Sequence, residues 1–124
     1  MNFSTVLHYF ALVFGAFTLI IGVLAALKPE GMSKNFGIAA SGQCLPYVIT
    51  TGIRDVFMSL VIFVLFFTEH WEALGMTCLC LGVVAISDFF IVRKYGNKKA
   101  SLIHLGGAIG VVGYGVALLF HYYN

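Results

Sequence analysis

The segment TTGIRDVFMSLVIFVLFF, residues 50–67, decides the fold of this chain. Beyond Asp55 it is apolar at every position except Ser59. Such a run comes close to the ~20 residues that an α-helix needs to cross the ~30 Å hydrocarbon core of a bilayer. Arg54 and Asp55 nevertheless stand side by side near its start, and ionisable residues inside membrane spans mark functional sites by default. The segment therefore predicts a membrane-spanning helix that carries part of a polar site.

The composition of the whole chain agrees with a membrane location. Hydrophobic residues make up 60% of the 124 residues and charged residues only 10%, which leaves too little polar surface to cover a water-soluble globule. The net charge of +2 is small, and the basic residues form no stripe with interleaved aromatics, so we expect no nucleic-acid partner. The sequence predicts an integral membrane protein.

Four apolar runs follow one another along the chain, and no strand-like alternation lies beside them. The first loop, KPEGMSKNFGIAASGQC, is long enough for a short interfacial helix. We predict an all-α fold, a bundle of four transmembrane helices that forms one domain over residues 1–124. The predicted spans are residues 8–27, 46–67, 71–92 and 101–122.

The basic residues outside the spans predict the orientation. Short cytoplasmic loops collect Lys and Arg, and these residues are confined to the first and third loops. Both termini are therefore expected outside the cytoplasm, with the chain in a bacterial inner membrane or a eukaryotic endomembrane. The six loop residues are Lys28, Lys34, Arg93, Lys94, Lys98 and Lys99.

Ionisable residues of three spans are expected at one depth. Counted from the cytoplasmic ends at a helical rise of 1.5 Å per residue, Arg54 lies roughly 12 Å inside, and Asp88 and His104 roughly 7 Å inside. Asp55 follows Arg54 directly. Because charges facing lipid are costly, these side chains should face inward, with Asp88 as the counter-charge of Arg54.

This layer favours acid–base chemistry. Histidine titrates near neutral pH, a neighbouring aspartate can orient its ring for proton transfer, and arginine can hold an oxygen that develops negative charge. The alternative without a chemical role is a structural clamp, that is, a buried ion pair that fixes the register of the helices. The predicted catalytic residues are Arg54, Asp55, Asp88 and His104, and the predicted substrate-binding residues are Tyr47, Thr51 and Ser87.

Two other features of the sequence bear on metal binding and on assembly. Four residues at the outer ends of the spans, His8, Glu69, His70 and His121, lack the spacing of a ligand motif, so we predict no metal and no cofactor. Separately, the small residues Gly106, Gly110, Gly113 and Ala117 of the fourth span favour close helix approach, either in a homodimer or against Ala11, Gly15, Thr18 and Gly22 of the first span.

The motif GIRD at the start of the second span, an Asp late in the third and a His early in the fourth resemble a family of short four-helix membrane proteins found in bacteria and fungi, catalogued as a domain of unknown function. The resemblance extends from about Leu12 to His121. It implies the fold and the position of a shared site at the four charged residues, and nothing about the substrate.

Two classes of function stay open. The first is an intramembrane isomerase, cyclase or hydrolase that acts on a lipid-like small molecule. The second is a binding or proton-coupled transport module for a small molecule or membrane lipid. A structural membrane subunit, in which the buried ion pair acts as a clamp, is a further alternative. Small multidrug transporters have a similar length but rely on a glutamate in the first span, and this first span has no acidic residue.

Overall fold

The chain is almost entirely helical. The computed structural model describes residues 2–124, and this part of the chain contains no strand. The elements are α1 (Phe3–Leu27), α2 (Pro29–Phe36), a 3₁₀ turn η1 (Gly42–Cys44), α3 (Leu45–Phe67), α4 (Trp71–Tyr95) and α5 (Lys98–Tyr123).

The four long helices are membrane spans by length and composition. Each covers 25 or 26 residues, with η1 counted as part of α3, which corresponds to about 37 to 39 Å at 1.5 Å per residue and exceeds a ~30 Å hydrocarbon core. Large apolar side chains such as Val13, Phe57, Val83 and Ile109 point away from the bundle and are more than half exposed. Lipid rather than water suits this surface, so the protein is a multi-pass integral membrane protein with a helical-bundle fold.

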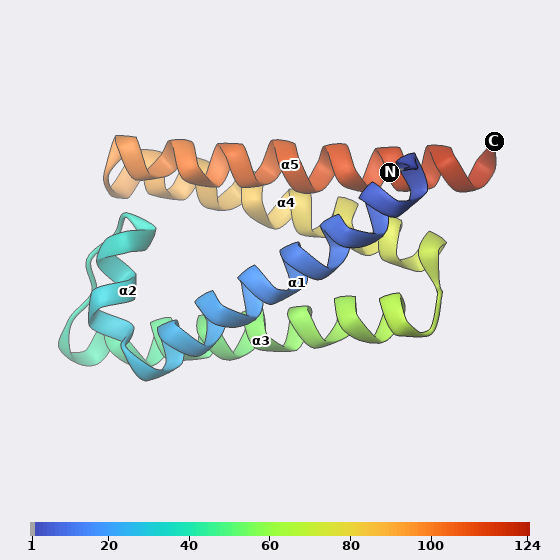
Figure 1. Ribbon diagram of the computed structural model, residues 1–124. Helices are drawn as coiled ribbons and strands as arrows, with labels where there is room; N and C mark the ends of the chain where they lie inside the picture. The colour runs from blue at the N-terminus through green and yellow to red at the C-terminus, as the bar shows by residue number, and fades with distance from the viewer. Residues whose placement is uncertain (1) are drawn as a thin grey trace.

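The long helices form two pairs, α1 with α3 and α4 with α5 (Figure 1). Paired glycines let the backbones touch within each pair. A Cβ atom added at Gly52 of α3 would lie 2.6 Å from the carbonyl oxygen of Gly22 in α1, and one added at Gly115 of α5 would lie 2.9 Å from the oxygen of Gly75 in α4. Small residues at such contacts are the usual means of helix association in membranes, where burial alone gives little driving force.

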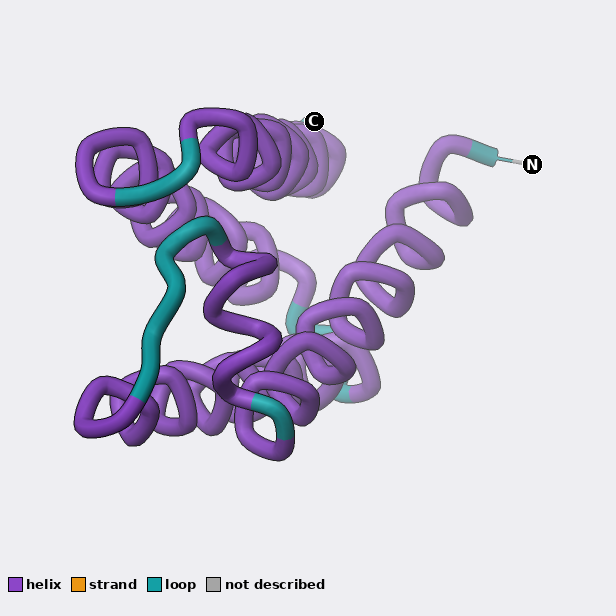
Figure 2. The backbone as a smooth tube through the Cα atoms, turned by 90° about the vertical axis from the view of Figure 1, so that its left-hand side faces the viewer, coloured by secondary structure: helices purple, strands orange, loops and turns teal. Residues whose placement is uncertain are grey.

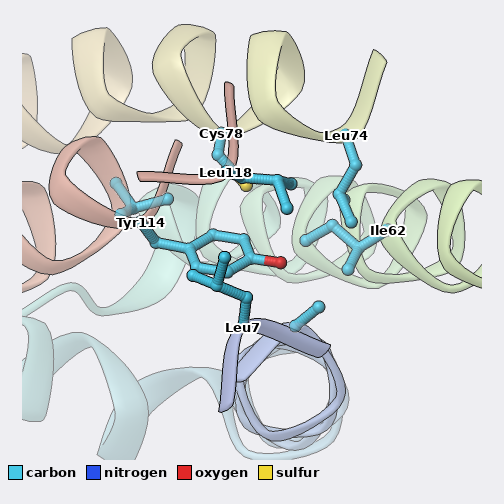
Figure 3. Packing of buried hydrophobic residues seen from close by; sticks show 8 residues of the cluster. Leu7, Ile62, Leu74, Cys78, Tyr114 and Leu118 are labelled. Atoms are coloured by element: carbon cyan, nitrogen blue, oxygen red, sulfur yellow. The ribbon is translucent and has the colours of Figure 1, made fainter. Parts of the chain in front are cut away.

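The two pairs meet near the end that holds the chain termini (Figure 1). Figure 3 shows the ring of Tyr114 between side chains of all four long helices, and its hydroxyl has no hydrogen-bond partner within residues 2–124. This packing joins the two helix pairs at the end of the bundle that holds the termini. The buried cluster consists of Leu7, Ala11, Ile62, Leu74, Cys78, Val111, Tyr114 and Leu118.

At the opposite end, α2 lies between the two pairs (Figures 1 and 2). The helix ends at Phe36 and is capped by Gly37, whose φ of 100° is the left-handed conformation that favours glycine. The carbonyl oxygen of Gly37 accepts a hydrogen bond of 2.8 Å from the backbone N–H of Asn97, in the turn between α4 and α5. The first loop therefore contains a helix, and a hydrogen bond at the end of that helix links it to the pair α4 and α5.

The glycine strip of α5 lies on the outer surface. Gly106, Gly110 and Gly113 are exposed, and a Cβ added at any of them would have no described atom within 4 Å beyond its own helix. For these three glycines, packing against α1 is therefore wrong, because Gly15 and Gly22 of α1 face α3 instead. Ala117, the fourth residue of the strip, packs against the buried cluster. The homodimer through this strip stays a prediction.

Candidate functional site

A cavity of about 410 Å³ lies between the two helix pairs, next to α2. All five helices contribute to its lining. The pairs touch closely at the terminal end through the buried cluster, and α2 holds them apart at the other end. A volume of this size falls within the range of ordinary small-molecule sites.

The four ionisable side chains predicted for the site all line this cavity. Arg54 and Asp55 come from α3, Asp88 from α4 and His104 from α5. Successive positions 51, 54, 55 and 58 face one side of α3 because a helix turns about 100° per residue, and Thr51 accordingly lines the cavity too. The two helix pairs thus present their charged groups to a common space.

Two of the predicted substrate-binding residues are not among the lining residues. The side chain of Tyr47 is 75% exposed at the start of α3. The Ser87 hydroxyl donates a 2.8 Å hydrogen bond to the carbonyl oxygen of Val83, one turn back on α4. The Thr51 hydroxyl is likewise donated to the carbonyl oxygen of Tyr47, at 2.9 Å. Of the three hydroxyls, only that of Thr51 reaches the cavity, and there it is free to accept.

The ion pair expected between Arg54 and Asp88 is not formed. Among residues 2–124, the one pair of opposite charges within 4.0 Å joins Lys34 and Glu30 at the surface of α2. The physical reason is that Arg54 and Asp88 belong to different helix pairs, with the cavity between the pairs. A structural clamp needs closely paired charges, so the arrangement is that of an open polar site.

His104 is the one ionisable residue of the cavity with a defined hydrogen bond in the described part of the chain. Its Nε2 lies 2.9 Å from the backbone carbonyl oxygen of Phe36, the last residue of α2. A carbonyl oxygen can only accept, so Nε2 carries a hydrogen, and in the neutral form of such a ring the lone pair is on Nδ1. The contact fixes both the tautomer and the orientation of a potential base.

The charged side chains of the cavity gather toward one end, and the other end is apolar. Near α2 the lining contains Thr51, Arg54, Asp55, Asp88 and His104 together with apolar residues such as Ile91 and Ile103, and further along the bundle it consists of apolar side chains of all four long helices. Helix position alone produces this gradient, because the charged residues lie within the α2-side halves of α3, α4 and α5. The apolar end includes Phe14, Met58, Ile62, Leu81 and Val111.

Sequence reasoning missed the contribution of α2. Asn35 and Phe36 line the cavity, and the Phe36 carbonyl positions His104. Both residues lie in the first loop of the sequence, where no periodic pattern signals an inward-facing helix. A backbone carbonyl also leaves no trace in residue identity, so only the three-dimensional structure reveals it.

The outer ends of the helices carry a second group of polar side chains. The ring of His8 stacks on that of Trp71 with centroids 4.1 Å apart, and the Tyr123 hydroxyl donates to a carboxylate oxygen of Glu72. Within residues 2–124, no group of three or more His, Cys, Asp or Glu side chains is arranged to hold a metal ion. We assign no binding role to this end.

Comparison with known proteins gives the family. The sequence pattern of the domain of unknown function DUF4267 matches residues 15–118, which include every lining residue of the cavity except Phe14. The chain belongs to the DUF4267 family. Its fold as a small bundle of apolar helices agrees with the resemblance found in the sequence. The chain matches no curated protein and no solved structure.

Proposed function

We propose that this member of the DUF4267 family is an intramembrane acid–base enzyme that acts on a lipid-like small molecule, by an isomerase, cyclase or hydrolase type of reaction. The observation that carries the proposal is the convergence of Arg54, Asp55, Asp88 and His104 on one cavity without an ion pair among them. An unpaired charged group in a membrane span costs free energy, so its presence there indicates a role in ligand binding or in a reaction.

The roles follow from the chemistry of each group. His104, with its Nε2–H donated to Phe36, offers Nδ1 as a proton acceptor, and the carboxyl groups of Asp55 and Asp88 can give or take a proton from the facing helices. The Arg54 guanidinium is the one fixed cation and suits an oxygen atom that gains negative charge in the transition state. Proton transfer then needs no further group.

The gradient of polarity supports an amphiphilic substrate. A molecule with its polar end at the charged residues places its apolar body against Phe14, Ile62 and Val111. The surrounding surface is apolar and faces lipid, so a substrate dissolved in the bilayer meets the protein without crossing water. Substrate binding by Thr51 fits this placement.

The topology bears on where the reaction would occur. The loop Lys and Arg residues lie at the end of the bundle that holds α2, and both termini lie at the other end (Figure 1). By the positive-inside rule we place the α2 end in the cytoplasm. The site would then occupy the cytoplasmic half of the membrane.

The test is turnover of an extracted lipid pool by the purified protein in nanodiscs, followed by mass spectrometry and chromatography of the products. His104→Gln and Asp88→Asn should each lower turnover by about 10²-fold or more, the usual contribution of a general acid or base. Matched controls are His121→Gln on α5 and Glu72→Gln on α4, which lie at the outer end and should leave turnover unchanged.

Two results would count against the proposal. Equal turnover by His104→Gln, Asp88→Asn and the wild type would remove the acid–base role. A wild type that retains a lipid without converting it, and loses it in the same two variants, would replace the enzyme with a binding or transport module.

A further inference from the structure

The charge balance of the cavity restricts the ligand that it can hold. Of the seven Lys and Arg residues in the chain, all of which lie in its described part, only Arg54 lines the cavity, whereas two carboxyl groups, Asp55 and Asp88, do so. Counted by formal charge, Arg54 contributes one positive charge and the carboxylates of Asp55 and Asp88 two negative charges, or −1 in sum. The lining offers no excess of positive charge.

An anionic head group fits this lining poorly. A phosphate or carboxylate would add negative charge beside two carboxyls, at a site where the low dielectric strengthens every charge interaction. Proteins that recognise phosphate bring several N–H donors or cations to it. Here the single guanidinium would face two competing carboxyls, so an anion gains little from Arg54.

An uncharged oxygen function uses the same groups fully. A carbonyl, hydroxyl or epoxide oxygen can accept from Arg54, and a hydroxyl can in addition donate to a carboxyl of Asp55 or Asp88. A cationic head group would pair with the carboxyls, as their excess negative charge favours, but it offers no oxygen that could accept a hydrogen bond from Arg54. The neutral oxygen is therefore the polar end that satisfies both signs of charge.

The volume indicates the size class of the ligand. About 410 Å³ lies within the range of ordinary small-molecule sites. An amphiphile with one chain of about a dozen carbons belongs to that class.

We infer that the substrate is an uncharged, oxygen-bearing amphiphile of about a dozen carbons, such as an alcohol, ketone, aldehyde, ester or epoxide, rather than a phosphorylated, carboxylated or cationic lipid. The inference rests on the proposed function and names the substrate class of that site.

The experiment compares four probes with one chain and different head groups: 1-dodecanol, dodecanoate, dodecyl phosphate and dodecyltrimethylammonium. Each is added below its micellar concentration to the full-length protein in phosphatidylcholine nanodiscs, and bound probe is counted by native mass spectrometry. Gly107→Leu fills the cavity, because Gly107 lines it and an added Cβ meets no described atom within 4 Å beyond its own helix. Gly106→Leu, on the outside of the same helix, is the control.

We expect dodecanol to bind at least 10-fold more tightly than either anion and than the cation, Gly107→Leu to weaken it at least 10-fold, and Gly106→Leu to leave it unchanged. Asp88→Asn removes one negative charge and should narrow the preference for dodecanol over dodecanoate about 10-fold. Ala85→Phe, which also projects into the cavity from its lining, replaces Gly107→Leu if that variant does not fold.

Other results separate the two proposals. Tighter binding of an anion or of the cation, still sensitive to the cavity-filling variant, would overturn the neutral substrate and leave the acid–base site standing. Binding of all four probes that neither cavity-filling variant changes would show that the cavity is not a ligand site, and both proposals would fall.

Discussion

The imidazole Nε2 of His104 and the backbone carbonyl oxygen of Phe36 lie 2.9 Å apart, although 68 positions separate the two residues in the chain. The bond links α5 to the C-terminal end of α2 and fixes the histidine tautomer. A short helix in a loop thereby takes part in the geometry of a site formed otherwise by membrane spans.

Gly37→Ala should disturb His104 without touching it. Gly37 has a φ of 100°, and an added Cβ would lie 2.6 Å from a methyl carbon of Val92 and 2.7 Å from the Cβ of Ala100. The end of α2 must then shift, at a cost of about 1 to 3 kcal/mol in unfolding free energy. ¹⁵N NMR of the His104 ring should show the Nε2–H tautomer in the wild type at high pH and a tautomer mixture in the variant.

Gly31→Ala is the control for that experiment. Gly31 lies within α2, and no described atom lies within 4 Å of an added Cβ beyond its own helix. Alanine is the better helix former by about 1 kcal/mol, so the variant should keep the His104 spectrum and be at least as stable as the wild type. A His104 spectrum unchanged by Gly37→Ala would show that α2 does not position the ring.

Gly52→Ala should weaken the pairing of α1 with α3. The added Cβ would lie 2.6 Å from the carbonyl oxygen of Gly22, so the two backbones must separate. We expect a loss of about 1 to 3 kcal/mol, as for other overpacked contacts, measured by thermal unfolding in detergent. Gly106→Ala, on the open face of α5, should not lower stability. Equal stability of the two variants would mean that these glycines do not form the contact.

The topology can be tested with a single cysteine. In a chain whose native Cys44, Cys78 and Cys80 are replaced by serine or alanine, Asn97→Cys in the turn before α5 should react with a membrane-impermeant maleimide only from the cytoplasmic side. Glu69→Cys, in the turn between α3 and α4, should react only from the opposite side. Labelling of position 97 from outside would invert the orientation.

The exposed glycine strip of α5 predicts a homodimer. Gly110→Ile places a branched side chain on the smooth face, where no described atom of the same chain lies near, and should weaken association while the monomer stays folded. Analytical ultracentrifugation in detergent measures the change. A wild type that is monomeric at all concentrations, or a dimer that Gly110→Ile leaves intact, would remove this prediction.

The helices and the common level of the charged residues along the bundle could be predicted because both depend on local sequence. A run of about 20 apolar residues is sufficient to indicate a span, and counting residues from its end places Arg54, Asp88 and His104. The helices extend a few residues past the predicted spans, for example to Phe3 in α1 and Tyr95 in α4, because hydropathy marks the lipid-facing part of a helix and not its last hydrogen bond.

The pairing of the helices and the shape of the site could not be predicted in the same way. Hydropathy does not say which span packs on which, and the expected ion pair of Arg54 with Asp88 assumed that their helices touch. The helix pairing and the position of α2 depend on contacts between distant segments, such as Gly22 with Gly52 and Phe36 with His104. Because α2 lies between the pairs, Arg54 and Asp88 face a cavity and do not form an ion pair.

The most direct test of the central claim is the double variant Arg54→Met with Asp88→Leu, measured for unfolding free energy and for lipid turnover together. Because the two side chains are not paired, the double variant should fold and insert with a stability within about 1 kcal/mol of the wild type or above it, and Asp88→Leu alone should lack the 3 to 5 kcal/mol penalty of a broken buried pair. Turnover should be lost in both variants. A double variant that is stable and fully active, or a single variant that the second substitution rescues, would contradict the account and identify the charges as a clamp.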